Sequence, residues 1–174
     1  MNSFYKNIGL YEYQTFEIEM NKSEFLEHLK KITYKTNSSF ISFIPDHGIP
    51  TRFEYRGFVT KDNFIIKRRK RFFDYNIFPS IIKGVISEKN NVTLIKIEFT
   101  PFSIHLLPLV LAPLLFLLIA IFEIRNEENY FMIAVPIILA VSQYFILKKN
   151  IKRDKYDFER ELNFIVRKSN QLKR

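Results

Sequence analysis

Two long apolar runs stand out against an otherwise alternating pattern of hydrophobic and polar residues. Residues 106–122 (LLPLVLAPLLFLLIAIF) contain no polar side chain, and residues 130–147 (YFMIAVPIILAVSQYFIL) have Ser142 and Gln143 as their clearly polar members. Extended to 104–124, the first run has about 21 residues, which as a helix would be roughly 31 Å long and match the hydrocarbon core of a bilayer. Because few soluble cores bury such runs on every face, we expect a transmembrane helical hairpin over 102–147. Its spans are expected at about 104–124 and 130–147.

The segment between the two runs is a turn of five residues, RNEEN, at 125–129. So short a connection makes the spans antiparallel and leaves both flanks on one side of the membrane. The turn is net acidic, whereas four basic residues follow the second run: Lys148, Lys149, Lys152 and Arg153. The positive-inside rule then predicts that both termini are cytoplasmic. Because heavy use of Ile, Phe, Asn and Lys is typical of an AT-rich bacterial genome, we expect the bacterial cytoplasmic membrane.

The first flank alternates as a strand and then as a helix. Residues 15–20 (TFEIEM) place apolar side chains at every second position, which is typical of a β-strand. Asn21 followed by Glu24 matches a capping box. An amphipathic helix is therefore expected over 22–33, with its apolar positions at Phe25, Leu26, Leu29 and Ile32. Residues 36–50 mix turn residues with a short apolar run, which indicates a loop with one short strand.

A shared pattern in the middle of the flank predicts two β-hairpins. RGFVTKDN at 56–63 and KGVISEKN at 83–90 both combine a basic residue, a glycine, two apolar residues and a polar turn. Each leads into a run rich in β-branched and aromatic residues, which is the sequence signature of a hairpin. Gly57 and Gly84 are expected to mark bulges or close approaches of the backbone.

The last strand and the C-terminal segment are expected to close the core. One face of the strand over 92–99 carries Thr93, Ile95, Ile97 and Phe99. This strand ends at TPF, 100–102, directly before the first span, so the sheet should lie close to the bilayer. A helix is expected over 154–168, with an apolar stripe at Phe158, Leu162, Ile165 and Val166. We expect this stripe to pack across the sheet.

Together these elements predict an α+β fold: a small antiparallel sheet of hairpins packed by one or two helices, with an inserted transmembrane helical hairpin. The expected parts are a cytosolic β-rich part at 1–101, the hairpin at 102–147 and a cytosolic C-terminal helix at 148–174 that packs on the first part. Their net charges are +5, −2 and +6, which make up the total of +9. The chain has no cysteine, so neither a disulfide nor a thiol metal site is expected. Residues 1–14 lack the apolar core of a secretory signal peptide.

Three stretches between Tyr55 and Phe99 carry a family resemblance: YRGFVTKDNFIIK, YNIFPSIIKGVI and TLIKIEF. They resemble a group of uncharacterised small bacterial two-pass membrane proteins that have a β-rich cytosolic part, a central helical hairpin and a charged C-terminal helix. Strands followed by a packing helix are also loosely similar to bacterial pleckstrin-homology-like (PH-like) domains fused to a membrane hairpin. In this chain the hairpin instead falls between the strands and the last helix. The resemblance implies this layout, and it implies neither catalytic residues nor a ligand.

The block KRRKRFF at 67–73 is the candidate site. If its strand continued, Arg68 and Lys70 would share a face with Phe64 and Ile66. Such a face could not be buried, so we expect the strand to leave the sheet near Lys67. Three interpretations remain open: binding of nucleic acid, adsorption to anionic lipid headgroups at about 1 kcal/mol per cation, or a solvated loop that follows the positive-inside bias. A domain tethered to a bilayer argues against nucleic acid. The lipid-surface candidates are Lys67, Arg68, Arg69, Lys70, Arg71, Phe72 and Phe73.

No catalytic motif accompanies the block. The three histidines, His28, His47 and His105, have no metal-ligand spacing, PDHG at 45–48 is expected to be a turn, and nucleotide-binding and hydrolase signatures are absent from the sequence. We therefore expect a protein that is not an enzyme, has no cofactor, and acts as a binding or interaction module at the membrane surface. An accessory subunit of a larger membrane complex and a small membrane enzyme are the alternatives. Expected partners are the lipid bilayer, anionic headgroups, and a membrane protein or second copy that Gln143 could contact, but no nucleic acid.

Overall fold

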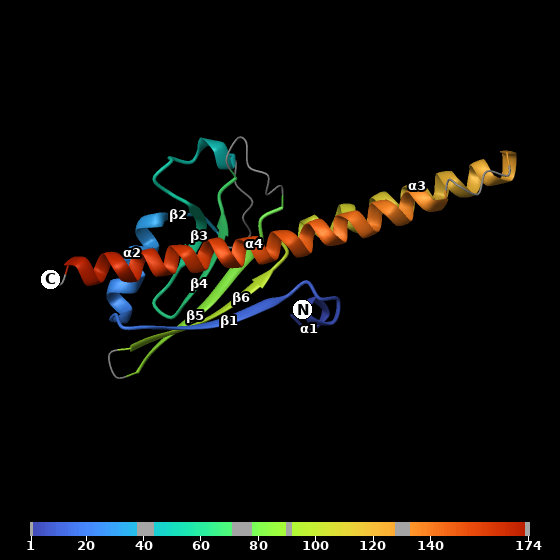
Figure 1. The fold of residues 1–174 in the computed structure, drawn as a ribbon. Helices are drawn as coiled ribbons and strands as arrows, with labels where there is room; N and C mark the ends of the chain where they lie inside the picture. The colour runs from blue at the N-terminus through green and yellow to red at the C-terminus, as the bar shows by residue number, and fades with distance from the viewer. Residues whose placement is uncertain (1, 38–43, 71–77, 90–91, 128–132, 173–174) are drawn as a thin grey trace.

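The computed structural model describes residues 2–37, 44–70, 78–89, 92–127 and 133–172. Its elements form a sheet domain from which a long pair of helices projects to one side (Figure 1). A short helix α1 (Asn2–Asn7) precedes the sheet domain in the chain, and α2 (Lys22–Ile32) lies within it. The projecting pair consists of α3 (Leu106–Glu127) and the first part of α4 (Ala134–Leu172). The fold is α+β, as the sequence predicts.

The sheet has six strands in the order β1-β6-β5-β4-β3-β2. Their bounds are β1 Glu12–Ile18, β2 Thr33–Lys35, β3 Tyr55–Val59, β4 Asn63–Arg68, β5 Ile81–Lys89 and β6 Val92–Thr100. The expectation of an antiparallel sheet is wrong at one edge, because β2 pairs with β3 in parallel. The long connection between β2 and β3 returns the chain to the end of the sheet where β2 began, and such a crossover is what parallel pairing requires.

Both predicted hairpins are present, as β3–β4 and β5–β6. Their glycines both lie against β4, where each leaves room for a neighbour. At Gly57, which has a φ of 151°, a Cβ would collide with the carbonyl oxygen of Ile65. At Gly84 a Cβ would collide with the Phe64 ring. The expected close approach is confirmed at both positions, although at Gly84 the neighbour is a side chain rather than backbone.

The predicted helix over 22–33 is confirmed as α2. Asn21 occupies the N-cap position, but its side chain makes no capping hydrogen bond. The first backbone hydrogen bond of the helix runs from Phe25 N to Asn21 O at 3.1 Å. The turn expected at PDHG is a short 3-10 helix, η1 (Asp46–Gly48).

The second part of α4 covers one face of the sheet, and the predicted stripe is confirmed. Phe158, Leu162 and Ile165 are buried, and Val166 packs against the same core. Phe158 lies at the centre, with its ring edge-on to Tyr55 at 5.5 Å and to Phe99 at 6.3 Å between centroids. Thr93, Ile95, Ile97 and Phe99 are all fully buried below it, as the alternation in 92–99 predicts.

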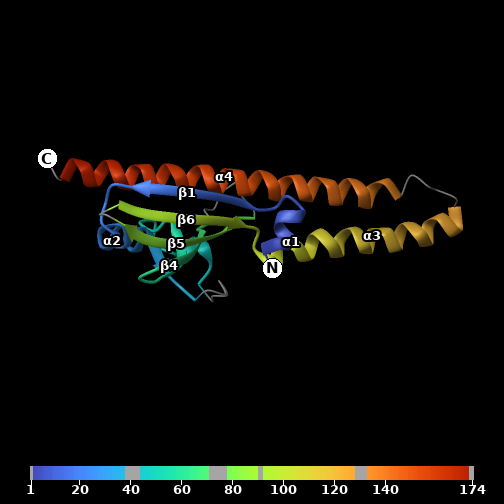
Figure 2. The same ribbon diagram turned by 90° about the horizontal axis from the view of Figure 1, so that it is seen from below.

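The projecting pair, here called the arm, consists of α3 and residues 134–147 of α4, which lie side by side in two views (Figures 1 and 2). The C-terminal helix does not begin at a boundary near 148, because α4 runs unbroken from Ala134 to Leu172. One helix of the described residues, Ala134–Lys168 within α4, is long and apolar enough to cross a membrane, and a shorter apolar helix covers Val110–Phe122.

The base of the arm is tied to the N-terminal helix. Tyr5 of α1 is buried, and its hydroxyl is 3.1 Å from the hydroxyl of Ser103, in the short 3-10 helix η2 (Ser103–His105) that leads into α3. The Tyr144 hydroxyl of α4 donates to Ile8 O at 3.0 Å. These two contacts hold α1 against both helices at the point where they leave the sheet domain.

Candidate functional site

The basic block does not leave the sheet at Lys67, contrary to expectation. Lys67 and Arg68 belong to β4, and Arg69 N continues the pairing by donating to Glu54 O of the neighbouring chain segment at 2.9 Å. Alternation along the strand sends Arg68 to the face covered by α4 and sends Lys67 and Arg69 to the opposite face. Each of these side chains has a partner outside the sheet: Asp46 for Lys67, Asp157 for Arg68 and Ile49 O for Arg69. The strand pattern alone does not reveal these partners.

Arg68 belongs to the junction between β4 and α4. Its guanidinium forms an ion pair with Asp157. One turn earlier on α4, Asp154 is buried and accepts hydrogen bonds from Ser80 N at 2.5 Å and from Ser80 Oγ at 2.6 Å. Burial raises the pKa of Asp154 to about 6 despite these hydrogen bonds. These contacts fix α4 to the sheet, so Arg68 serves the fold rather than an exposed basic surface.

On the opposite face, basic residues of β3 and of the end of β4 lie beside one carboxylate, that of Asp46. This basic cluster consists of Arg56, Lys67, Arg69, Lys70 and Asp46. Arg56 donates to Asp46 Oδ1 in a close ion pair, and Lys67 Nζ lies 3.7 Å from Asp46 Oδ2. The backbone N of Lys70 donates to Asp46 Oδ2 at 3.2 Å. Strand register explains the gathering, because Arg56 and Lys67 are directly paired across β3 and β4.

Burial and charge act against each other in the cluster. Burial lowers the pKa of the Lys67 amino group, and the charge of Asp46 opposes this shift. Burial alone would raise the pKa of the Asp46 carboxyl, but the hydrogen bond from Arg56 and the charge of Lys67 outweigh it, so the pKa lies below its usual value. Asp46 is therefore ionised at neutral pH and is the resident counter-ion of the cluster.

The two arginines keep buried donors without acceptors. Arg56 is 3% exposed and Arg69 is 7% exposed. Arg69 Nη1 donates to Ile49 O at 3.0 Å, and Arg56 Nη1 donates to Asp46. Arg56 Nε and Nη2 and Arg69 Nε are buried with no hydrogen-bond partner. Buried polar groups in native proteins are nearly always paired, so these three donors require an explanation.

The cluster lies at the end of the sheet that leads into the arm. Lys67 of β4, Ile81 of β5 and Thr100 of β6 form one row across the sheet. Phe102 follows Thr100 by two residues and precedes η2 and α3. Lys67 Nζ lies 5.7 Å from the centroid of the Phe102 ring. The basic cluster and the base of the arm are thus next to each other.

The remaining members of the predicted site are placed as follows. Lys70 is partly buried, with its Nζ 5.9 Å from the centroid of the Phe78 ring. Arg71, Phe72 and Phe73 lie outside the described residues. Whether the block adsorbs to lipid therefore stays a prediction.

The sequence analysis did not identify Arg56 and Asp46 as members of the cluster. The cation inside the apolar strand YRGFV was a signal that could have pointed to Arg56.

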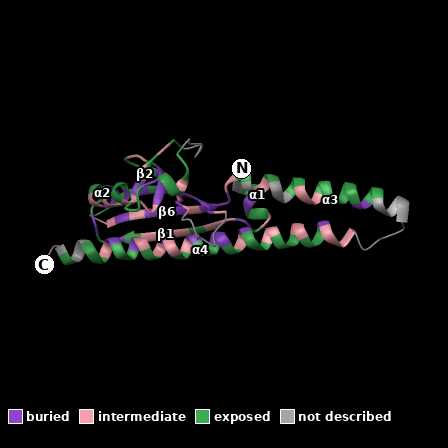
Figure 3. Cartoon of the chain, turned by 90° about the horizontal axis from the view of Figure 1, so that it is seen from above, coloured by how far each residue is buried: buried purple, intermediate pink, exposed green. Residues whose placement is uncertain are grey.

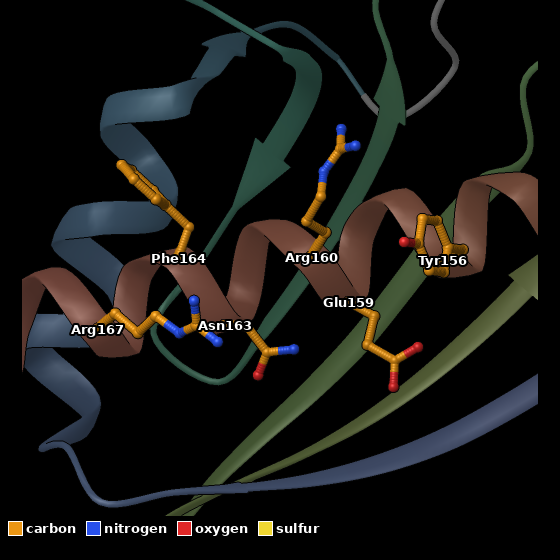
Figure 4. Close-up of a pocket in the computed structure, with 6 residues that line it drawn as sticks. All are labelled: Tyr156, Glu159, Arg160, Asn163, Phe164 and Arg167. Carbon is orange, nitrogen blue, oxygen red and sulfur yellow. The ribbon is translucent and has the colours of Figure 1, made fainter.

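A groove elsewhere in the described structure is a weaker candidate for a binding site than the basic cluster. A groove of about 310 Å³ runs along α4 and is lined by Tyr156, Glu159, Arg160, Asn163, Phe164 and Arg167 (Figure 4). All six side chains come from a single helix, so no second element helps to enclose a ligand. Among the described residues no group of three His, Asp or Glu could hold a metal ion.

No family model matches the chain, and neither a curated protein nor a solved structure is significantly similar to it. The case for a function therefore depends on the geometry of this chain alone.

Proposed function

We propose that the protein is a two-pass membrane protein whose arm spans the bacterial cytoplasmic membrane, with the sheet domain as a non-catalytic binding module at its cytoplasmic surface. The observation that carries the proposal is the surface of the arm. Large apolar side chains cover it and are exposed on both helices, among them Val110, Leu114, Leu118, Phe122, Ile138 and Phe145. Soluble proteins rarely expose a continuous apolar surface of this extent, so a hydrocarbon environment is the consistent surrounding.

The distribution of burial supports the same conclusion. The buried residues concentrate in the sheet domain, whereas the arm is mostly exposed or intermediate (Figure 3). The 22 residues of α3 give a length of roughly 33 Å at about 1.5 Å per residue, which is enough to cross the hydrocarbon core.

The base of the arm has the composition of a membrane interface. Lys148, Lys149, Lys152 and Arg153 follow the apolar part of α4. Phe4 of α1 is exposed beside this base, and Lys6 of the same helix lies over the Tyr11 ring at 4.7 Å. Aromatic and cationic side chains favour the headgroup region on the cytoplasmic side. This arrangement supports a sheet domain held directly against the bilayer, with both termini in the cytoplasm.

A second candidate function, accessory subunit of a larger membrane complex, is favoured by a different observation. An apolar notch of about 240 Å³ opens between the two helices of the arm, lined by Pro113, Leu114, Leu117, Pro136, Ile137 and Ala140. One proline of each helix, Pro113 and Pro136, lines the notch. A side chain from another membrane helix, or from a second copy, would fill such a notch.

Topology mapping tests the proposal in intact bacteria. A reporter fused after Arg174 should be active only when it is cytoplasmic, and a cysteine introduced at Asn126 should react with a membrane-impermeant reagent from outside. The chain has no native cysteine, so the label reports on that position alone. If position 126 reacts only after the cells are opened, the arm does not cross the membrane as proposed.

A further inference from the structure

The unpaired donors of the basic cluster have a specific chemistry. In a guanidinium group, Nε and Nη2 lie on one edge and donate in parallel, which matches two oxygens of a carboxylate or phosphate. In Arg56 this edge is the part without a partner, while Nη1 is occupied by Asp46. Arg69 lies two residues beyond Lys67 on the same face of β4 and adds another unpaired donor, Nε. The donors therefore belong to neighbouring side chains.

Asp46 does not reach the unpaired edge of Arg56. Asp46 is the acid that the described contacts bring to Arg56, Lys67 and the Lys70 backbone. Asp46 uses both of its carboxylate oxygens in these contacts and leaves the Nε–Nη2 edge of Arg56 without an acceptor. An anion with several acceptor oxygens would satisfy this edge.

From these observations we infer that the basic cluster is a binding site for a phosphate-type oxoanion, either a lipid headgroup phosphate or free phosphate. Arg56 holds the oxoanion through its Nε–Nη2 edge, and Lys67, Arg69 and Lys70 supply the remaining charge. Asp46 occupies part of the site in the empty state and is displaced or moved aside on binding. For a lipid headgroup the inference rests on the proposed function, since only a membrane-bound domain meets such a phosphate.

The exposure of the side chains and their places in the fold are consistent with an oxoanion that displaces Asp46. The side chains of Asp46 and Lys67 are 13% and 10% exposed, against 4% for Arg56, so an anion from outside meets Asp46 and Lys67 first. Asp46 is on the short η1 turn, outside the regular pairing of the sheet. The cations lie on β3, on β4 and directly after β4. Displacing Asp46 therefore moves a turn and leaves the cation-bearing strands in place.

The experiment uses the full chain in nanodiscs and two phosphate sources. In the first arm, inorganic phosphate is titrated into phosphatidylcholine nanodiscs, with chloride at equal ionic strength as the reference for screening. In the second arm, phosphatidic acid is included in the nanodisc. Thermal stability and calorimetry report binding, because a ligand of the folded state raises its melting temperature. Stabilisation beyond chloride is expected, in the first arm for free phosphate and in the second arm for a headgroup.

Three variants separate a built site from general electrostatics. Arg56→Lys keeps the charge but removes the bidentate edge, so phosphate affinity should fall roughly tenfold or more. Arg52→Lys is the matched control, since Arg52 is exposed on the loop before β3, and it should bind like the wild type. Asp46→Asn removes the competing carboxylate, so the stabilisation by phosphate should be larger than in the wild type.

The Asp46→Asn result keeps the inference testable even if Arg56→Lys does not fold. Absence of any stabilisation beyond chloride in both arms would overturn the site. So would equal losses in Arg56→Lys and Arg52→Lys, or a smaller phosphate effect in Asp46→Asn than in the wild type. None of these outcomes touches the topology of the arm, so a failed phosphate site and a failed membrane assignment give different results.

Discussion

α4 passes through two different surroundings within one unbroken helix. In residues 134–147 most of the large apolar side chains are exposed, including Ile138, Val141 and Phe145. From Leu147 onward, burial instead recurs every three or four residues, at Leu147, Ile151, Asp154, Phe158, Leu162 and Ile165. Backbone geometry is the same in both halves, so the difference comes from what each half faces.

The comparison shows which property of a helix predicts its surroundings. A stripe of apolar residues identifies a helix that packs on one side, as the second half does on the sheet. Apolar residues on all sides identify a helix for which no single partner surface is enough. The first half has α3 on one side, yet Ile138 remains 60% exposed. The proposed membrane assignment accounts for this exposure, because it surrounds the first half with an apolar solvent.

The largest effect is expected from a charge in the buried stripe. Leu162 is 1% exposed, so Leu162→Asp loses a packed side chain and buries an unpaired carboxylate, a cost of about 4 kcal/mol or more. Phe164→Asp, two residues further on the exposed side of α4, should cost less than about 1 kcal/mol. Denaturant unfolding of both variants in nanodiscs measures the difference. Equal stability of the two variants would mean that α4 does not pack as described.

The next largest effect should come from the arm. Ile138 and Phe164 are both 60% exposed, so substitution by lysine removes similar packing from each. In a bilayer Ile138→Lys should cost about 3 kcal/mol of insertion free energy, whereas Phe164→Lys should cost none. The membrane-inserted fraction after carbonate extraction is the measurement. If both lysine variants insert as well as the wild type, residues 134–147 do not face lipid.

A third prediction concerns a buried acid in the second half of α4. Burial raises the pKa of Asp154 to about 6, so between its unfolded pKa and this value the folded state holds a proton that the unfolded state has released. The stability contributed by Asp154 is therefore fully present below about pH 4 and is lost as the pH rises to about 6, by up to about 3 kcal/mol. Asp154→Asn should remove this loss and stabilise the protein at pH 7.

Unfolding free energies measured from pH 4 to pH 7 test the effect at Asp154. The asparagine can still accept the Ser80 hydrogen bonds through its side-chain oxygen, so the comparison isolates the charge. Parallel pH curves for the wild type and Asp154→Asn, or a less stable variant at pH 7, would contradict the assigned ionisation.

The smallest effect is expected at a partly exposed ion pair between α4 and β1. Lys155 Nζ lies 3.0 Å from Glu12 Oε2, and both side chains are about one third exposed. Because water and salt screen such a pair, Lys155→Met should change stability by less than about 1 kcal/mol. The difference should shrink further at high salt. A loss comparable to that of Leu162→Asp would mean that ion pairs, rather than the apolar stripe, hold α4 on the sheet.

Local patterns in the sequence were enough to predict most of the elements. Alternation in 92–99 predicted the buried face of β6, the glycine-containing repeats predicted both hairpins, and spacing predicted the stripe through Phe158 and Leu162. Each of these signals depends on neighbours within one strand, turn or helix. The parallel edge strand β2 was missed, because its direction depends on a long connection and not on its own three residues.

For the buried polar residues, only the tertiary structure shows why burial is tolerated. Asp154 interrupts the apolar stripe and is tolerated there because Ser80, distant in the sequence, donates two hydrogen bonds to it. Lys67 and Arg69 look like residues of an exposed loop, yet both are buried, Lys67 beside the Asp46 carboxylate and Arg69 with its guanidinium hydrogen-bonded to Ile49 O. Hydrophobicity is a property of each residue and can be read along the chain. The partner of a buried charge is a property of the fold, since the energy of the charge depends on groups that only folding brings within hydrogen-bond distance.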